Sequence, residues 1–140
     1  MAKSVLVVDD SALMRNLFKE IVERDDELAV IGVAENGRLA LQQVLALKPD
    51  VVLLDIEMPE MDGIGVLKRM LLLGKQKVII VSSAILPDSP RADEVRKLGA
   101  AEILLKPYGA IGPDDGVLKG DEIIRTIRRV LDMSPMETGD

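Results

Sequence analysis

The sequence predicts a single α/β domain in which helices cover both faces of a five-stranded parallel sheet. Short aliphatic runs alternate along the chain with segments whose apolar residues recur at helical spacing. The aliphatic runs are continuously apolar, as expected for strands that are covered on both faces. The length of 140 residues is that of one domain, because domains usually have about 100–200 residues.

The strands are predicted from five runs rich in Val, Ile, Leu and Ala. Runs of this length, bounded by turn-forming or polar residues, are typical of strands. Because the aromatic content is only 1%, the core between them is expected to be aliphatic. The runs lie at residues 4–8, 29–34, 51–54, 77–82 and 102–106.

Four helices are predicted between the strands from apolar residues spaced three and four apart. Gly74 and Gly99 follow the third and fourth, and glycine is common directly after a helix. The fourth is the weakest, with only Val95 and Leu98 as large apolar anchors. The first presents Leu13, Met14, Leu17, Phe18, Ile21 and Val22 on one face. The four helices lie at residues 11–24, 37–48, 63–73 and 89–98.

The C-terminal part of the chain predicts a link, a last helix and a tail. Residues 108–120 contain four glycines and a proline, which predicts a long link. The last helix is expected at residues 121–132, where apolar residues again recur at helical spacing. Residues 134–140 are polar and predict a frayed tail. The domain is therefore expected to span residues 1–133.

The strand order follows from the rules for parallel sheets. Right-handed crossovers between consecutive strands give a doubly wound sheet. At this length the flavodoxin-like order 2-1-3-4-5 is the natural choice. In that order the first and third strands are neighbours, and ligands bind at the carboxyl ends of the strands.

Three carboxylates are predicted to meet at that end of the sheet. Asp9 and Asp10 follow the first strand directly, and Asp55 ends the third. Like charges at such short range repel, and burial strengthens the repulsion, so the arrangement requires a cation. Carboxylate oxygens are hard ligands that suit Mg²⁺. The sequence therefore predicts a Mg²⁺ site beside a reactive aspartate.

Composition excludes several classes of protein. A formal charge of −6, from 24 acids and 18 bases, argues against a nucleic-acid-binding surface. No run approaches a membrane span of about 20 apolar residues, and the absence of cysteine fits a reducing compartment, so we expect a cytoplasmic protein without membrane insertion. The chain has no histidine, so it contains no Ser-His-Asp triad and is neither a histidine kinase nor a histidine phosphotransfer protein.

Several short segments, taken in order, resemble the receiver domain of two-component response regulators. The resemblance extends over about residues 4–131. Within the family, the chain is most similar to receivers of the chemotaxis methylesterase branch and, after them, to the single-domain chemotaxis regulator. The chain would then be a receiver over residues 1–133. The segments are DDSALMR at residues 9–15, DIEMPEMDG at 55–63, VSS at 81–83 and KP at 106–107.

The resemblance implies a phosphoryl-transfer chemistry for the three acids. Asp55 would be the phosphoacceptor, whose carboxylate forms an acyl phosphate. Asp9, Asp10 and Asp55 would bind Mg²⁺, and Glu57 would add its backbone carbonyl and leave its side chain at the mouth of the site. An alternative role for Asp9 or Asp10 is to cap the helix that begins near Ser11.

The resemblance also assigns roles at the ends of the fourth and fifth strands. Ser82 would hydrogen-bond a phosphoryl oxygen, the small Ser83 would leave room for a phosphodonor, and Lys106 would pair with Asp55. Pro107 would follow a cis peptide that aims the lysine inward. Receivers usually carry Tyr or Phe where this chain has Ile103, so the aromatic half of their switch is missing.

The implied function is that of a phosphorylation-activated signalling switch and not of an enzyme. A sensor histidine kinase of the chemotaxis type would phosphorylate Asp55, and the output would reach a C-terminal effector domain or a downstream protein. A stand-alone regulator is the alternative within the family. Outside it, a haloacid-dehalogenase-like phosphatase would need an acid/base Asp where Glu57 stands, and a flavodoxin-like FMN binder would meet repulsion from Asp9 and Asp10.

Overall fold

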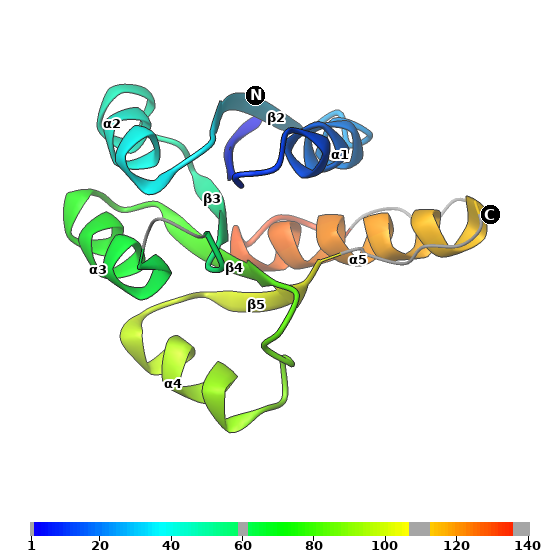
Figure 1. The fold of residues 1–140 in the computed structure, drawn as a ribbon. Coiled ribbons are helices and arrows are strands. Elements are labelled where there is room, and N and C mark those ends of the chain that lie inside the picture. The colour runs from blue at the N-terminus through cyan, green and yellow to red at the C-terminus, as the bar shows by residue number, and fades with distance from the viewer. Residues whose placement is uncertain (1, 59–61, 107–112, 136–140) are drawn as a thin grey trace.

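The computed structural model describes residues 2–58, 62–106 and 113–135, and in residues 113–119 the backbone alone. Its five strands form one parallel sheet in the order β2-β1-β3-β4-β5, which confirms the predicted topology (Figure 1). The strands are β1 (Lys3–Val8), β2 (Leu28–Ala34), β3 (Val51–Asp55), β4 (Lys77–Ser82) and β5 (Glu102–Leu105). The helices are α1 (Ala12–Val22), α2 (Gly37–Leu47), α3 (Gly63–Leu73), α4 (Pro90–Leu98) and α5 (Pro113–Val130).

The sheet separates two apolar layers. In β1, Val5 and Val7 pack with α1 and α5, whereas Leu6 and Val8 pack with α2, α3 and α4. This division follows from strand geometry, because successive side chains point to opposite faces. Since both faces are covered, an uninterrupted aliphatic run is the pattern that this sheet requires. Phe18 is the single phenylalanine of the chain and is buried on the α1 and α5 side.

The helices begin at capping residues. The Ser11 hydroxyl accepts a hydrogen bond from the Met14 N–H and caps α1. The alternative role predicted for Asp9 or Asp10 as the cap is therefore wrong. Asn36, Asp62 and Ser89 cap α2, α3 and α4 in the same way. These side chains satisfy backbone donors that the first helical turn leaves unpaired.

The apolar face of some helices is narrower than predicted. Leu98 is 40% exposed and does not anchor α4, which is held instead by Ala92 and Val95. Leu13 of α1 is 77% exposed, although it was expected on the buried face. Helical spacing alone does not show how wide a stripe the neighbouring sheet covers, so residues at the edge of the stripe were misplaced.

The predicted link over residues 108–120 is wrong in its second half, because α5 begins at Pro113. Proline favours the first position of a helix, and two acids follow it in the sequence. Gly120 lies inside α5 where this helix approaches α1. A Cβ at Gly120 would lie 2.6 Å from Arg24 Nη1 and 3.5 Å from Ile21 Cγ2. Gly120 is therefore a buried residue of α5 that faces α1, and it is not part of a flexible link.

Arg128 fastens α5 to the turn before β2. Its guanidinium donates to Asp25 at 2.8 Å, to Glu27 at 2.9 Å and to the Ser134 carbonyl at 2.7 Å. The side chain is buried. The end of α5 is thus held against the side of the molecule that carries α1.

Replacing Gly120 with alanine is expected to raise the free energy of unfolding by about 0.5–1 kcal/mol, because glycine inside a helix is less favourable than alanine. The nearest obstacle is the exposed guanidinium of Arg24, which can move aside. Gly63→Ala is the contrasting variant. Its Cβ would meet backbone of Ile56, with the Cα at 2.8 Å, so it should lose stability. Urea denaturation measures both, and a destabilised Gly120→Ala protein would show that Arg24 does not move aside for the added methyl group.

Candidate functional site

The three predicted acids meet at the carboxyl ends of β1 and β3. The strands are parallel neighbours in which Val8 is level with Leu54, so the residues that follow are brought together. One carboxylate oxygen from each of Asp9, Asp10 and Asp55 lies within 4.8 Å of the others. Asp9 and Asp55 are buried, and Asp10 is exposed. We call these three residues the acid pocket.

Lys106 reaches into the acid pocket from the end of β5. Its Nζ lies 3.1 Å from Asp55 Oδ2 and 3.1 Å from Asp9 Oδ2. The Lys106 N–H donates to the Ser82 carbonyl at 2.9 Å, which fixes the lysine beside β4. The pairing with Asp55 was predicted, whereas the equal distance to Asp9 was not. These charges lie close together because Asp9, Asp55 and Lys106 stand at the carboxyl ends of β1, β3 and β5.

Burial and pairing oppose each other in the acid pocket. Burial raises the pKa of Asp55, and the hydrogen bond from the Glu57 N–H and the contact with Lys106 only partly offset it. Burial alone would lower the pKa of Lys106, but the carboxylates of Asp9 and Asp55 outweigh it and raise that pKa. Lys106 therefore stays charged at neutral pH and is the cation of the pocket.

The donor set fits a divalent cation. Three carboxylates face a single lysine among the described residues, which leaves negative charge in excess. Asp9 Oδ1 accepts from the Ser11 N–H at 2.9 Å, and Asp55 Oδ1 accepts from the Glu57 N–H at 2.9 Å. These bonds fix the orientation of both carboxylates. Oriented, hard oxygen donors of this kind suit Mg²⁺.

The Glu57 carboxylate lies between two serines at the end of β4. Ser82 Oγ donates to Glu57 Oε2 at 2.8 Å, and both Ser83 N–H and Oγ donate to Oε1, at 2.8 and 2.7 Å. Burial would raise the pKa of Glu57, but the hydrogen bonds from Ser83 and Ser82 outweigh it and lower that pKa. We call Glu57, Ser82 and Ser83 the serine clamp.

The serine clamp was not predicted, although its parts were singled out. Glu57 was expected to leave its side chain at the mouth of the site, and Ser82 was expected to hydrogen-bond a phosphoryl oxygen. The available signal was topological. β3 and β4 are neighbours, with Asp55 level with Val81, so an acid just after one strand and two serines at the end of the other can meet. The same argument had placed the three aspartates.

Ile103 is buried and packs in the apolar layer with Ile80 and Val95. This aliphatic side chain stands at the position where an aromatic residue was expected from the resemblance. The cis peptide predicted before Pro107 lies outside the described residues.

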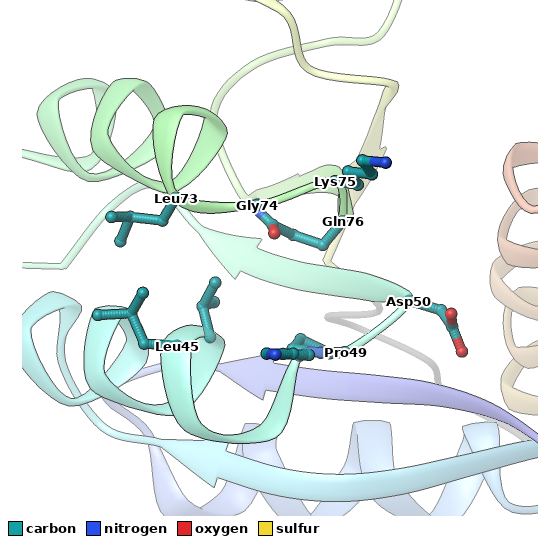
Figure 2. A pocket seen from close by; sticks show the side chains of 9 residues that line it. Leu45, Pro49, Asp50, Leu73, Gly74, Lys75 and Gln76 are labelled. Carbon is teal, nitrogen blue, oxygen red and sulfur yellow. The ribbon is translucent and has the colours of Figure 1, made fainter.

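A groove at the opposite end of the sheet carries none of this chemistry (Figure 2). It has a volume of about 400 Å³ and lies between the last turns of α2 and α3, with Leu45 and Leu73 on its walls. Asp50 is at its edge, but the carboxylate already accepts from Ser4 N–H and Oγ. No helix among the described residues is long and apolar enough to cross a membrane.

Known proteins similar to this chain include a family model, two curated relatives and solved structures. The family model for the response regulator receiver domain matches residues 5–111. Two protein-glutamate methylesterase/protein-glutamine glutaminases are similar in sequence. That of Carboxydothermus hydrogenoformans is 44% identical over 76% of this chain and 30% of the relative. That of Halalkalibacterium halodurans is 46% identical over 79% of this chain and 32% of the relative. The chain thus spans about a third of the length of these relatives.

Solved structures are similar in fold and sequence. The response regulator domain of Thermotoga maritima CheB has a TM-score of 0.84 and is 35% identical, covering 96% of this chain and 100% of that one. The complex of the P1 domain of CheA3 with CheY6 from R. sphaeroides contains a chain with a TM-score of 0.77 and 34% identity, covering 93% of this chain and 97% of that one.

Proposed function

The chain belongs to the response regulator receiver domain family, and from this premise we propose that Asp55 accepts a phosphoryl group from a histidine kinase. The observation that carries the proposal is a buried aspartate beside a charged lysine, with Nζ 3.1 Å from Oδ2. An oxygen of Asp55 forms a bond to phosphorus as the N–P bond of the donor phosphohistidine breaks, and the imidazole leaves with the bonding electrons. Little other covalent machinery is required, because positioning and charge neutralisation drive phosphoryl transfer.

Asp9, Asp10 and Asp55 would hold Mg²⁺, together with the backbone carbonyl of Glu57. The ion would neutralise the charge that the acids and the phosphoryl oxygens bring together. The exposure of Asp10 is consistent with an ion that keeps part of its water shell. Backbone N–H groups hold Oδ1 of Asp9 and Oδ1 of Asp55, so both carboxylates are already oriented in the pocket.

Lys106 and Ser82 would recognise the phosphoryl group after transfer. The ammonium of Lys106 already faces Asp55, so it can follow the charge onto new phosphoryl oxygens. Ser82 ends β4 beside Asp55, and its hydroxyl can donate once it turns away from Glu57. Ser83 is small and exposed, which leaves room for a phosphodonor. With Ile103 buried in the core, the response would travel through the segment from Ser83 to the start of α4.

The partners follow from the relatives. We propose a chemotaxis-type sensor histidine kinase as donor and an effector domain or downstream protein as receiver of the output. The methylesterase activity named for the relatives would lie outside these 140 residues, and a stand-alone regulator is the alternative. The receiver would occupy residues 1–133, because Arg128 holds α5 against the rest of the domain. The protein would be cytoplasmic. Residues 134–140 would be a tail.

A phosphatase of the aspartyl-phosphate class is the second candidate function. It would require the acid two residues after Asp55 to donate and accept protons. That acid is Glu57, and its two oxygens accept hydrogen bonds from Ser82 and Ser83. This engagement, and the lowered pKa of Glu57, favour the receiver.

Replacing Asp10 with asparagine is expected to weaken Mg²⁺ binding by roughly tenfold or more, since even outer partners of metal ligands contribute 10–100-fold. Asp10 is exposed, so the fold should survive the change. Asp26→Asn is the matched control because it removes one exposed acid outside the acid pocket. A Mg²⁺ titration followed by amide NMR measures both affinities. Equal affinities in the two variants would contradict the assignment of Asp10 to the metal.

A further inference from the structure

The hydrogen-bonding capacity of the Ser82 hydroxyl is fully used. Its oxygen accepts from the N–H groups of Ala84 at 3.0 Å and Ile85 at 2.9 Å, and its one hydrogen is donated to Glu57 at 2.8 Å. A hydroxyl has one hydrogen and two acceptor positions. The side chain is also fully buried. Ser82 therefore cannot donate to any further acceptor while it is bonded to Glu57.

Ser83 holds the acceptor in place. Its N–H and its hydroxyl both donate to Glu57 Oε1, at 2.8 and 2.7 Å, while Oε2 takes the hydrogen of Ser82. Three donors at the end of β4 thus fix the carboxylate of Glu57, which follows the neighbouring strand β3. Bonds to a charged acceptor are roughly twice as strong as neutral ones, so the serine clamp is a real competitor for the Ser82 hydrogen.

We propose that Glu57 is a positioning residue that retains the hydroxyl hydrogen of Ser82 in the unphosphorylated protein and competes for it with a phosphoryl group on Asp55. The inference rests on the proposed function, because it concerns how the phosphorylated state is recognised. Release of Ser82 from Glu57 would also move the acceptor that Ala84 and Ile85 share. The competition therefore sets how readily phosphorylation changes the segment that leads to α4.

A double-mutant cycle with beryllofluoride, a phosphoryl mimic, and Mg²⁺ tests the competition. Glu57→Gln keeps the shape of the side chain but makes the acceptor neutral. We expect it to bind beryllofluoride about fivefold more tightly than the unmodified protein, the difference between a charged and a neutral hydrogen bond. In a Ser82→Ala background the same change should have almost no effect, because no hydrogen remains to be released. Fluorine NMR or calorimetry measures the four affinities for beryllofluoride.

The cycle separates competition from simple repulsion. If Glu57 acted only through its negative charge near an anion site, Glu57→Gln would raise affinity by the same factor in both backgrounds, and the proposal would be overturned. Failure of the unmodified protein to bind beryllofluoride would overturn the proposed function itself. Binding without coupling between the two positions would overturn the role of Glu57 alone.

A second measurement does not depend on Ser82→Ala. In the free Glu57→Gln protein, the amide NMR signals of Ala84 and Ile85 should move toward their positions in the beryllofluoride-bound unmodified protein, because both groups donate to Ser82 Oγ. A population shift of this kind places the variant on the line between the two end states. Signals that stay at their free positions would overturn the proposal.

Discussion

Replacing Asp55 with asparagine is expected to abolish phosphoryl incorporation from acetyl phosphate in the presence of Mg²⁺. The amide has nearly the shape of the carboxylate but is not a nucleophile, so no acyl phosphate can form. Asp9 and Lys106 would remain 3.1 Å apart, which preserves the rest of the pocket. Intact-mass measurement under mild conditions should show one added phosphoryl group in the unmodified protein and none in the variant.

The matched control for this experiment is Asp62→Asn. Asp62 is exposed and caps α3 close to the site, and asparagine caps a helix equally well. This variant should still be phosphorylated. Hydroxylamine should remove the group, because it cleaves acyl phosphates. Incorporation that persists in Asp55→Asn, or that resists hydroxylamine, would show that another residue carries the phosphate.

Replacing Lys106 with methionine is expected to lower the free energy of unfolding by about 3 kcal/mol in the absence of Mg²⁺. Removal of one partner from a buried ion pair leaves charge uncompensated, at a cost of about 3–5 kcal/mol. Here the loss would leave Asp9 and Asp55, each 1% exposed, facing each other. Lys75→Met, which removes an exposed lysine at the far end of the sheet, should change stability little.

Mg²⁺ and pH should both modify the effect of Lys106→Met. Mg²⁺ is expected to restore part of the lost stability, because a bound cation replaces the ammonium. Burial raises the pKa of Asp55 and Lys106 opposes that rise, so the folded variant binds a proton at Asp55 more readily than its unfolded state and more readily than the folded unmodified protein. The stability deficit of the variant should therefore shrink as pH falls toward that pKa and grow as pH rises above it. Urea denaturation gives these values, and a deficit that is independent of both would contradict the pairing.

The topology and the acid pocket could be predicted because both follow from long-range regularities of the chain. Uninterrupted aliphatic runs require a sheet covered on both faces, and parallel strands bring their carboxyl ends together. Asp9, Asp10 and Asp55 needed no more than this. The start of α5 could not be predicted in this way. Gly120 is typical of a link in the sequence, whereas in the structure it is a buried residue of α5 that faces α1.

The serine clamp shows a second limit of the sequence. That Ser82, Ser83 and Glu57 stand at the ends of neighbouring strands could be read from the topology. Which acceptor the Ser82 hydroxyl uses depends on side-chain rotamers and on how three donors share one carboxylate. The equal distances from Lys106 to Asp9 and Asp55 are of the same kind. Such choices are decided by local geometry that residue types and spacing do not specify.

Locating the phosphoryl group on the chain tests the central claim most directly. After reaction with acetyl phosphate and Mg²⁺, borohydride reduces an acyl phosphate to an alcohol and so marks the acceptor aspartate as homoserine. Peptide mass spectrometry of the reduced protein should find this mark at Asp55 alone. A mark at Asp9 or Asp10, or phosphate retained on a serine such as Ser82, would contradict the assignment of Asp55 as the phosphoacceptor.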